Sequence, residues 1–424
     1  MLEKLLQIWK TKDLRNKILY VVLMLVIFRL VAYIPIPGVD IIALRRFFDS
    51  NQLLGLMNVF SGGTMQNFSV IMLGVGPYIT ASIIFQLLAM VVPSLEEMSK
   101  EGEAGQRRLN QYTRLLTVPL AFLQAYSMIM LLRQTGQGIV GNLDLFHFIT
   151  TMVTITGGTM FLMWLGELIS EKGIGNGISI LIFAGIISSL PTSLQQMFVT
   201  FDRAQIIELI IYALIAIVTI VGVVFVTEAQ RNIPVVYAKQ VRGNRVFGGG
   251  NNHLPLRVNM AGVIPIIFAI SIILFPSMVA QFFIKAKTAW LASLAQGTIH
   301  LFNNSVFYAA AYFLLVVGFT YFYTAVIFHP QKIAENLQKQ GGFIPGVRPG
   351  KLTTEYLQYT MNRILLAGSV FLGVIAILPL ILRNVTGSQS MVIGGTSLLI
   401  VVAVVIEIVK QVESQMTMRD YEQY

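Results

Sequence analysis

The sequence predicts an all-α polytopic membrane protein with ten transmembrane helices. Three observations support this prediction: an apolar composition, ten apolar runs of membrane-spanning length, and an internal repeat. Of the 424 residues, 55% are hydrophobic and 12% are charged, whereas soluble domains carry about 25% charged residues. The mean hydropathy is +0.72. Water gives a folded chain no way to hide that much apolar surface, but lipid accepts it.

Each apolar run is close to the length of about 20 residues that a helix needs to cross a bilayer. The runs are expected to be helical, because lipid offers no hydrogen-bonding partner to an exposed backbone. The expected spans are residues 18–36, 71–93, 115–132, 148–166, 174–194, 206–227, 258–282, 306–328, 364–382 and 391–409.

The distribution of Lys and Arg predicts the orientation. Twenty-two of the 30 basic residues fall in one alternate set of loops and tails, seven fall in the other, and Arg29 lies inside the first span. Cytoplasmic loops carry the excess of Lys and Arg, so both termini are expected in the cytoplasm. The net charge of +10 is therefore explained first by membrane topology, and binding to nucleic acid is only a secondary explanation. Arg29 would cost about 2.5–3.5 kcal/mol at a helix centre, but it lies towards the outer end, where it is expected to snorkel.

Two pairs of segments resemble one another at the same positions of successive five-helix groups. Residues Gly74–Ala81 align with Gly262–Ala269, and Gly177–Ile182 align with Gly395–Ile400. Five helices is an odd number, so the second group must run opposite to the first. Inverted repeats of this kind form membrane passages at their interface. The sequence thus predicts two inverted five-helix halves around a central pore, with chance similarity of apolar segments as the alternative.

The repeat also selects four isoleucines. It pairs Ile79 with Ile267 and Ile182 with Ile400, each eight or nine residues from the end of its span. That distance is about 12–14 Å along a helix, in a hydrocarbon core about 30 Å thick. All four are therefore expected near the midplane, although ordinary helix packing explains isoleucine equally well on residues alone.

The motifs of enzymes and metal sites are missing from the sequence. It holds no phosphate-binding loop and no zinc motif, and no nucleophile elbow. Its four histidines are scattered without ligand spacing, at positions 147, 253, 300 and 329. Proton-coupled transporters carry ionisable groups deep in the membrane, whereas Glu208 and Glu407 lie near span ends. We therefore expect no catalytic residues, no metal and no cofactor, and a passive conduit. A secondary transporter for a small solute is the alternative, and it would need a polar midplane site.

The expected N-terminal half covers residues 1–200, and the expected C-terminal half covers residues 201–424. The C-terminal half includes two long basic cytoplasmic loops, 228–257 and 329–363, with five basic residues each. Positive charge sets topology, but the length of these loops also favours a docking surface, where RNA phosphates would suit Lys and Arg.

Turn chemistry predicts local structure in both loops. In the first, Ile233–Val241 is expected to be extended, with a turn at Arg242–Asn244 and a strand restarting at Arg245. In the second, Gln331–Gln340 is expected to be helical and capped by two glycines.

Collinear motifs along the whole chain resemble the SecY family of protein-conducting channels. The motifs are Ile34–Gly38, Met57–Gly63, Pro77–Ser82, Gly166–Glu167, Gly175–Ser179, His253–Gly262, Phe343–Gly350 and Gly394–Ile400. The resemblance implies an hourglass pore in the plasma membrane for unfolded polypeptides, with a lateral gate that releases signal sequences and membrane segments into lipid. It also implies small SecE and SecG subunits, and the ATPase SecA or a ribosome docked on the cytoplasmic loops.

The same resemblance implies a pore ring and a plug. The ring residues carried over are Val75, Ile79, Ile178, Ile182, Ile267 and Ile400, with Val75 in place of the family's usual isoleucine. The plug residues are Met57, Asn58, Val59, Phe60, Ser61, Gly62, Gly63, Thr64, Met65 and Gln66. On residues alone, an ordinary surface loop explains this uncharged, glycine-bearing segment equally well.

Two further groups of residues follow from the resemblance. Thr80, Gln86 and Asn259 are expected to line the lateral gate and to hydrogen-bond across it, with bonding inside one helix as the alternative. Arg245 and Arg348 are expected to contact the motor or the ribosome. The family's usual Arg-Arg pair is Asn244-Arg245 here, so one contact is expected to be lost.

Overall fold

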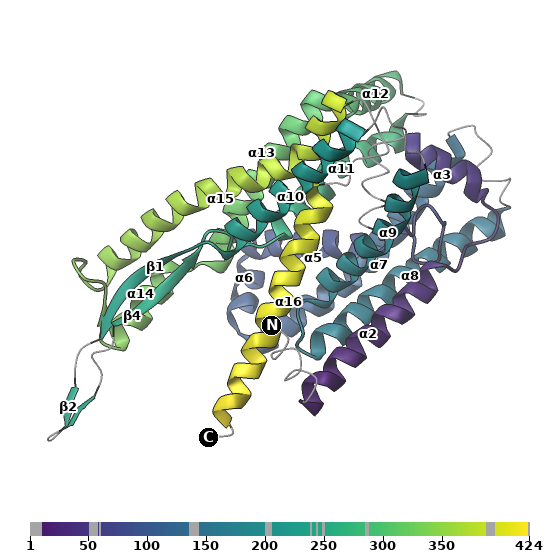
Figure 1. Cartoon of the computed structure of the whole chain (residues 1–424). Coiled ribbons are helices and arrows are strands. Elements are labelled where there is room, and N and C mark those ends of the chain that lie inside the picture. The colour runs from purple at the N-terminus through teal and green to yellow at the C-terminus, as the bar shows by residue number, and fades with distance from the viewer. Residues whose placement is uncertain are drawn as a thin grey trace. The chain divides into compact units, whose positions relative to one another are not determined.

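The computed structural model has a helix in each of the predicted spans (Figure 1). It describes residues 11–50, 58, 61–134, 144–199, 206–237, 240–242, 245–247, 251–284, 288–386 and 395–422. A helix covers most of every predicted span: α2 (Lys12–Ala32), α5 (Gly76–Val91), α7 (Glu103–Gln134), α8 (Leu145–Glu171), α9 (Gly177–Val199), α10 (Ile206–Glu228), α11 (Ile264–Phe283), α13 (Ser305–Ile327), α15 (Lys351–Thr386) and α16 (Gly395–Glu422).

Four helical stretches in the described residues are long and apolar enough to cross a membrane by length and composition alone. They are Glu103–Arg133, Leu145–Glu171, Ser305–Lys339 and Lys351–Leu382. A fifth results if α5 and α6 (Pro93–Lys100), which are bent by 103° at their junction, count as one span. The polytopic helical class is thus supported, and the number of ten spans stays a prediction.

Local chemistry explains several helix ends. The Asp144 side chain accepts a hydrogen bond from the backbone N–H of Leu145 and caps α8. The Asn304 side chain accepts from Val306 and Phe307 at the start of α13. Pro93 lacks an N–H, which fits the first turn of a new helix but not the interior of one. The chain accordingly breaks at Val92, between α5 and α6.

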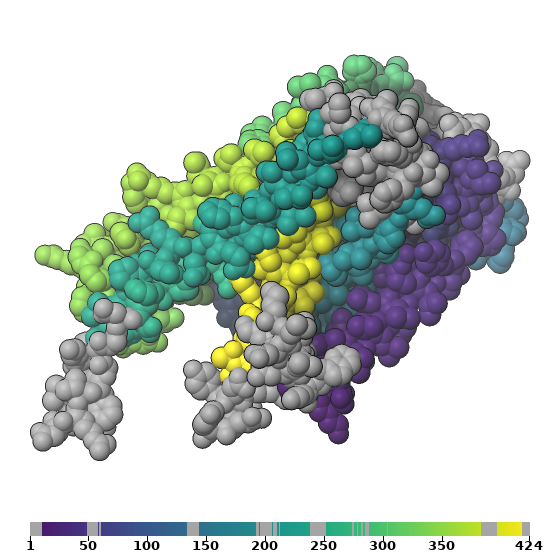
Figure 2. Space-filling view, viewed as in Figure 1, coloured from purple at the N-terminus to yellow at the C-terminus, as the bar shows by residue number. Residues whose placement is uncertain are grey.

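The outer surface of α2 fits a lipid environment. The helix forms part of the purple surface in Figure 2. Its exposed side chains include five large apolar ones. They follow the three- and four-residue spacing of one helix face: Leu19, Val22, Leu23, Val26 and Leu30. A continuous apolar strip is rare on soluble monomers, whereas a membrane helix needs one.

The chain forms two compact units. Unit 1 comprises Met1–Gln205, Leu274–Asn303 and Val404–Tyr424, and unit 2 comprises Ile206–Ile273 and Asn304–Ala403. The predicted division into halves at residue 200 stays a prediction.

Unit 1 is organised around α8, which packs against α2, α7 and α9, while α7 also packs against α5. A core of buried apolar side chains joins these helices to α3 (Ile41–Ser50) and to the segment before α5. It includes Leu44, Phe48, Phe68, Met72, Ile129, Leu132 and Ile155. An isolated bridge between Pro35 and Ser69 fixes the segment before α5 to the end of α2. The helix α12 (Ala289–Asn303) also belongs to this unit.

Unit 2 joins a helical part to a small sheet. In the helical part α15 packs against α10 and α13. The strands β1 (Gln230–Tyr237), β4 (Asn251–Arg257) and β5 (Gly342–Phe343) form an antiparallel sheet in the order β4-β1-β5. The strands β2 (Gln240–Arg242) and β3 (Arg245–Phe247) pair as a hairpin, and α14 (Pro330–Lys339) packs against α15.

The described residues agree with the local structure predicted for both basic loops. In the first loop β1, β2 and β3 are extended, and Arg242 pairs with Arg245, as strands joined by the predicted turn would, while residues 238, 239, 243 and 244 lie outside the described residues. The second loop begins with α14, which ends before Gly341 in the left-handed conformation (φ +68°) that glycine favours. The pairing of β1 with β5, which joins the two loops into one sheet, is an additional finding.

Adjacent glycines on α8 provide a test of this packing. A Cβ on the buried Gly158 would overlap the carbonyl oxygen of Val70, whereas a Cβ on the exposed Gly157 meets nothing. We expect Gly158→Ala to destabilise the folded protein by about 1–3 kcal/mol, the usual cost of overpacking. Gly157→Ala should be neutral or slightly stabilising. Thermal unfolding in detergent compares the two variants, and equal stability would contradict the close approach of α8 to Val70.

Candidate functional site

The predicted plug lies in unit 1, and its described residues are bonded both to one another and to neighbouring parts of the chain. The structure describes Asn58 and residues 61–66, while Met57, Val59 and Phe60 lie outside the described residues. The backbone oxygen of Asn58 accepts from the Ser61 hydroxyl at 2.9 Å and from the Gly63 N–H at 2.8 Å. Its side-chain oxygen accepts from the Gln66 N–H at 3.1 Å. The described part of the segment is therefore a folded turn with its own hydrogen bonds.

Buried bonds connect the plug segment to the chain that leads into α5. The Thr64 hydroxyl donates to the carbonyl oxygens of Ser61 (2.9 Å), Ile71 (3.2 Å) and Met72 (3.4 Å). Thr64 is 1% exposed and Met65 is 3% exposed. An ordinary surface loop would expose such side chains, so the burial favours a plug that is seated in the protein.

Four predicted ring residues belong to unit 1, in two pairs one helical turn apart. The Ile79 N–H donates to the carbonyl oxygen of Val75 at 3.0 Å, which places these two residues on one face of the start of α5. Ile178 and Ile182 occupy the first turns of α9 with the same spacing. Val75 and Ile182 are buried, and Ile79 and Ile178 are half-buried.

Ile178 also takes part in helix packing. A Cβ on Gly166 of α8 would lie 2.6 Å from the Cδ1 atom of Ile178. The side chain of Ile178 therefore lies across the glycine where α8 and α9 meet. Helix packing accounts for at least part of its position, as the simpler interpretation of the sequence expected.

The other two ring residues belong to unit 2. Ile267 lies in the first turn of α11 and is 8% exposed, and Ile400 lies in α16 and is fully buried. Convergence of all six side chains on one axis stays a prediction.

The predicted gate residues form local bonds. The Thr80 hydroxyl donates to the carbonyl oxygen of Gly76 at 3.1 Å, and the Gln86 amide donates to the Ser82 hydroxyl at 3.1 Å, both within α5. Asn259 is 7% exposed, and its side-chain oxygen has no hydrogen-bond partner among the described residues. Thr80 and Gln86 thus bond within one helix, as the alternative interpretation expected. A role of the three residues in closing the lateral gate stays a prediction.

The predicted docking residues lie on the sheet region of unit 2. Arg348 is exposed in the turn between β5 and α15, where Gly346 (φ +81°) and Gly350 (φ +98°) take the left-handed conformation. The carbonyl oxygen of Arg348 accepts from the Thr353 hydroxyl at 2.9 Å, which fixes the backbone of the turn. Arg245 is the first residue of β3. The backbone of the turn is thus held in place, and the side chain of Arg348 is exposed on it.

A cluster of six buried apolar residues forms a small core in this region. It joins both basic loops and the start of α15: Ile233, Val235, Leu256, Leu337, Ile344 and Leu357. Because these side chains come from both loops, the two loops form a single folded surface.

In the described part of the chain, no group of three His, Asp or Glu side chains could hold a metal ion.

Comparison with known proteins assigns the family. The SecY family model matches residues 69–409 of the chain. The chain belongs to the SecY family. Curated SecY relatives named protein translocase subunit SecY are similar over nearly the whole length. The relative from Halalkalibacterium halodurans is 44% identical over 427 residues, covering 98% of this chain and 97% of that protein. The relative from Streptomyces scabiei is 43% identical over 436 residues, covering 100% and 99%.

Two solved structures share the SecY fold. One, described as a protein-conducting channel, has a TM-score of 0.66 and 19% identity, and the match covers 94% of this chain and 91% of that one. The second structure comes from a study of how the plug domain of SecY stabilises the closed state and maintains a membrane seal. It has a TM-score of 0.64 and 20% identity, and the match covers 94% of this chain and 92% of that one. These likenesses establish the fold.

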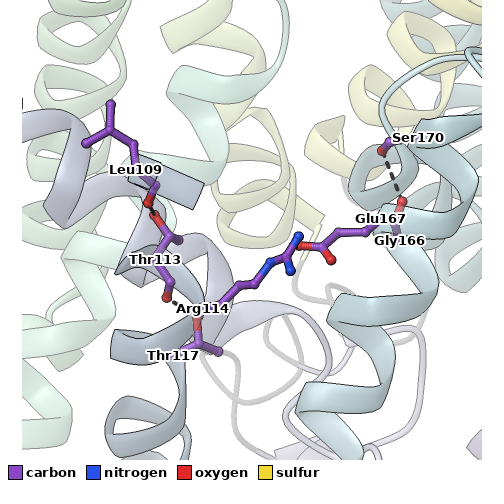
Figure 3. Close-up of polar contacts among 7 residues, drawn as sticks. All are labelled: Leu109, Thr113, Arg114, Thr117, Gly166, Glu167 and Ser170. Carbon is purple, nitrogen blue, oxygen red and sulfur yellow. Dashed lines mark hydrogen bonds and ion pairs between the residues drawn. The ribbon is translucent and has the colours of Figure 1, made fainter. Parts of the chain in front are cut away.

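An ion pair that the sequence did not predict ties together two helices of this SecY-family chain. The Nε atom of Arg114 on α7 lies 2.6 Å from a carboxylate oxygen of Glu167 on α8 (Figure 3). Around it, the hydroxyls of Thr113, Thr117 and Ser170 donate to carbonyl oxygens four residues back in their own helices. Glu167 belongs to a motif of the SecY resemblance, and a carboxylate at the end of an apolar run is a signal that a basic partner lies nearby. Its partner was not evident, since the two residues are far apart in sequence.

A double-mutant cycle tests this pair. We expect Arg114→Gln and Glu167→Gln each to destabilise the protein, and the double variant to lose less than the two losses together. The coupling should be about 1–2 kcal/mol, because one side chain is half-exposed and the other is mostly buried. Unfolding in detergent gives the four stabilities, and additive losses would contradict a direct α7–α8 ion pair.

Proposed function

We propose that this chain forms a passive, gated channel that conducts unfolded polypeptides across the plasma membrane and releases segments sideways into lipid. The observation that carries the proposal is 44% identity over 98% of the chain to a protein translocase subunit SecY. Both termini lie in the cytoplasm, in accord with the distribution of basic residues.

The seal follows from apolar side chains. A pore wide enough for a peptide must not leak ions, and charged side chains at a constriction would attract them. A narrow apolar constriction dewets and blocks conduction. The proposed ring of one valine and five isoleucines would do this, and it would contact a passing chain without preference for its sequence. The buried plug segment adds a second block.

The energy for transport comes from partners. Small membrane subunits, SecE and SecG, brace the channel, and SecA or a ribosome supplies the driving force. The sheet region is a suitable docking surface because it is folded, basic and presents Arg348 on a rigid turn. Guanidinium groups bind carboxylates and phosphates with two parallel hydrogen bonds, so an acidic protein surface or ribosomal RNA would suit it.

Two other functions are less well supported. A secondary transporter would need a polar site near the midplane, whereas the proposed ring there consists of one valine and five isoleucines. An enzyme would need a cluster of catalytic groups, and the sequence carries none of the catalytic motifs that would point to one. The direct test is reconstitution of the purified chain with SecE, SecG and SecA in vesicles. Protease protection of an unfolded client supports the proposal, and saturable uptake of a small solute without any client transport contradicts it.

The ring predicts a leak on polar substitution. We expect the double variant Ile79→Asn, Ile267→Asn to fold and to raise the resting ion conductance of planar bilayers, because amides hold water in the constriction. Clients with defective signal sequences should also pass more readily. The matched control, Ile79→Leu with Ile267→Leu, keeps the apolar volume and should stay sealed. If the Asn variant conducts no more ions at rest than the parent channel, these two residues are not part of the seal.

The docking surface predicts a selective loss of motor-driven export. We expect Arg348→Glu to impair export of a SecA-dependent client while leaving the abundance and membrane insertion of the channel unchanged, because the side chain is exposed. Lys339→Glu is the control, since it makes the same charge change on the exposed end of α14. Normal export in the Arg348 variant, or an equal defect in the control, would exclude a specific docking role.

A further inference from the structure

One arginine of α2 contacts the plug segment directly. Arg29 lies half-buried in the last turn of this otherwise apolar stretch of helix. Its Nη1 atom donates to the carbonyl oxygen of Gly62 across 3.3 Å. Its Nη2 atom lies 3.1 Å from the Tyr33 hydroxyl, and the guanidinium carbon lies 5.1 Å from the centre of the Tyr33 ring. The charged group is thus held by its own helix on one side and bound to the plug segment on the other.

The same glycine meets α9 backbone to backbone. A Cβ on Gly62 would lie 2.7 Å from the Cα atom of Gly185, and a Cβ on Gly185 would lie 2.6 Å from the Cα atom of Gly62. Gly62 also takes a left-handed conformation, with φ +77°, which a side chain would strain. Close backbone approach through paired small residues is a strong packing device in membrane proteins. Neither position accepts a larger residue without displacing the segment.

These contacts differ from the bonds inside the segment. The bonds of Asn58 with Ser61, Gly63 and Gln66 join residues of the segment to one another, so they can persist if it moves as a unit. The bonds of Thr64 to Ile71 and Met72 join the segment to the chain that leads into α5. The bond from Arg29 and the contact with Gly185 are different, because they join it to the helices α2 and α9, and both must break if the segment moves away from these helices. A guanidinium presents several donors in a planar fork, so Arg29 can bond to the Gly62 carbonyl and to Tyr33 at the same time.

We propose that Arg29 and Gly185 form a two-point latch that holds the plug segment, residues 58 and 61–66, in its closed position. The proposal rests on the plug function proposed above and names the residues that set the closed equilibrium. Arg29 acts as a positioning residue: it does not touch the conducted polypeptide but fixes the carbonyl of Gly62. Tyr33 orients the guanidinium, mainly through its ring.

The absence of cysteine from the sequence makes the opening measurable. Ser61→Cys introduces one near-isosteric thiol at a side chain that is 5% exposed in the closed segment. A membrane-impermeant maleimide, added from the outer side of sealed vesicles, labels it only when the segment leaves its seat. Ser69→Cys, at a fully buried position in the bridge to Pro35, is the matched control for general loosening of the fold.

We expect Arg29→Gln to accelerate labelling of Ser61→Cys by about tenfold or more, the factor that loss of a charged hydrogen bond produces in an opening equilibrium. Labelling of Ser69→Cys should not change. Arg29→Lys, which keeps the charge without the planar fork, should fall between the parent and Arg29→Gln. Tyr33→Phe removes the hydroxyl but keeps the ring, and should label at nearly the parent rate. Gly185→Ala should accelerate labelling as well, whereas Gly157→Ala, on an open face of α8, should not.

The outcomes separate the latch from the function of the plug. Unchanged labelling of Ser61→Cys in both Arg29→Gln and Gly185→Ala overturns the latch. Faster labelling of Ser69→Cys in the same variants also overturns it, because Arg29 and Gly185 would then support the fold as a whole. Faster labelling of Ser61→Cys alone, with unchanged resting conductance in planar bilayers, supports the latch and contradicts the proposed sealing role of the segment.

Discussion

Lipid offers no hydrogen-bonding partner to a peptide backbone, and this constraint shapes the predicted spans and the segments packed between them. The predicted spans fold as helices because only internal bonds satisfy their N–H and C=O groups. Their polar side chains obey the same rule. The hydroxyls of Thr113, Thr117 and Thr320, for example, donate to carbonyl oxygens one turn back in their own helix. Non-helical backbone next to the spans, such as the plug segment, is folded on its own hydrogen bonds and buried against protein.

The hydrophobic effect does not drive helices together inside lipid, so close packing has to do so. In unit 1 several close approaches occur at glycines. Gly158 faces the backbone of Val70, Gly166 faces Ile178, and Gly62 faces Gly185. Charged side chains are few and specifically placed. Arg114 and Glu167 join two helices, and Arg29 joins a helix to the plug segment. A protein of this construction has interfaces that can separate, which a gated channel requires.

Much of this fold was predictable from the sequence, because the controlling patterns are local. Each apolar run contains a helix, and the turn between β2 and β3 was evident from Arg242, Gly243 and Asn244. Contacts between distant segments were not predictable. The pairing of Val236 with Phe343, like the bond from Arg29 to Gly62, depends on how elements pack in three dimensions. The roles of Thr80 and Gln86 stayed open in the sequence, since a hydroxyl or an amide can bond within its helix or to a neighbour.

The central claim is that a passive, sealed conduit opens for a polypeptide. Ion conductance of planar bilayers containing the purified complex tests it most directly, measured first at rest and then with a translocation intermediate trapped by a folded domain at its end. The account predicts almost no current at rest, a large conductance while the trapped chain keeps the seal displaced, and a return to the resting current once the chain is released. A channel that conducts ions freely at rest, or one in which no client ever opens a conducting state, would contradict it.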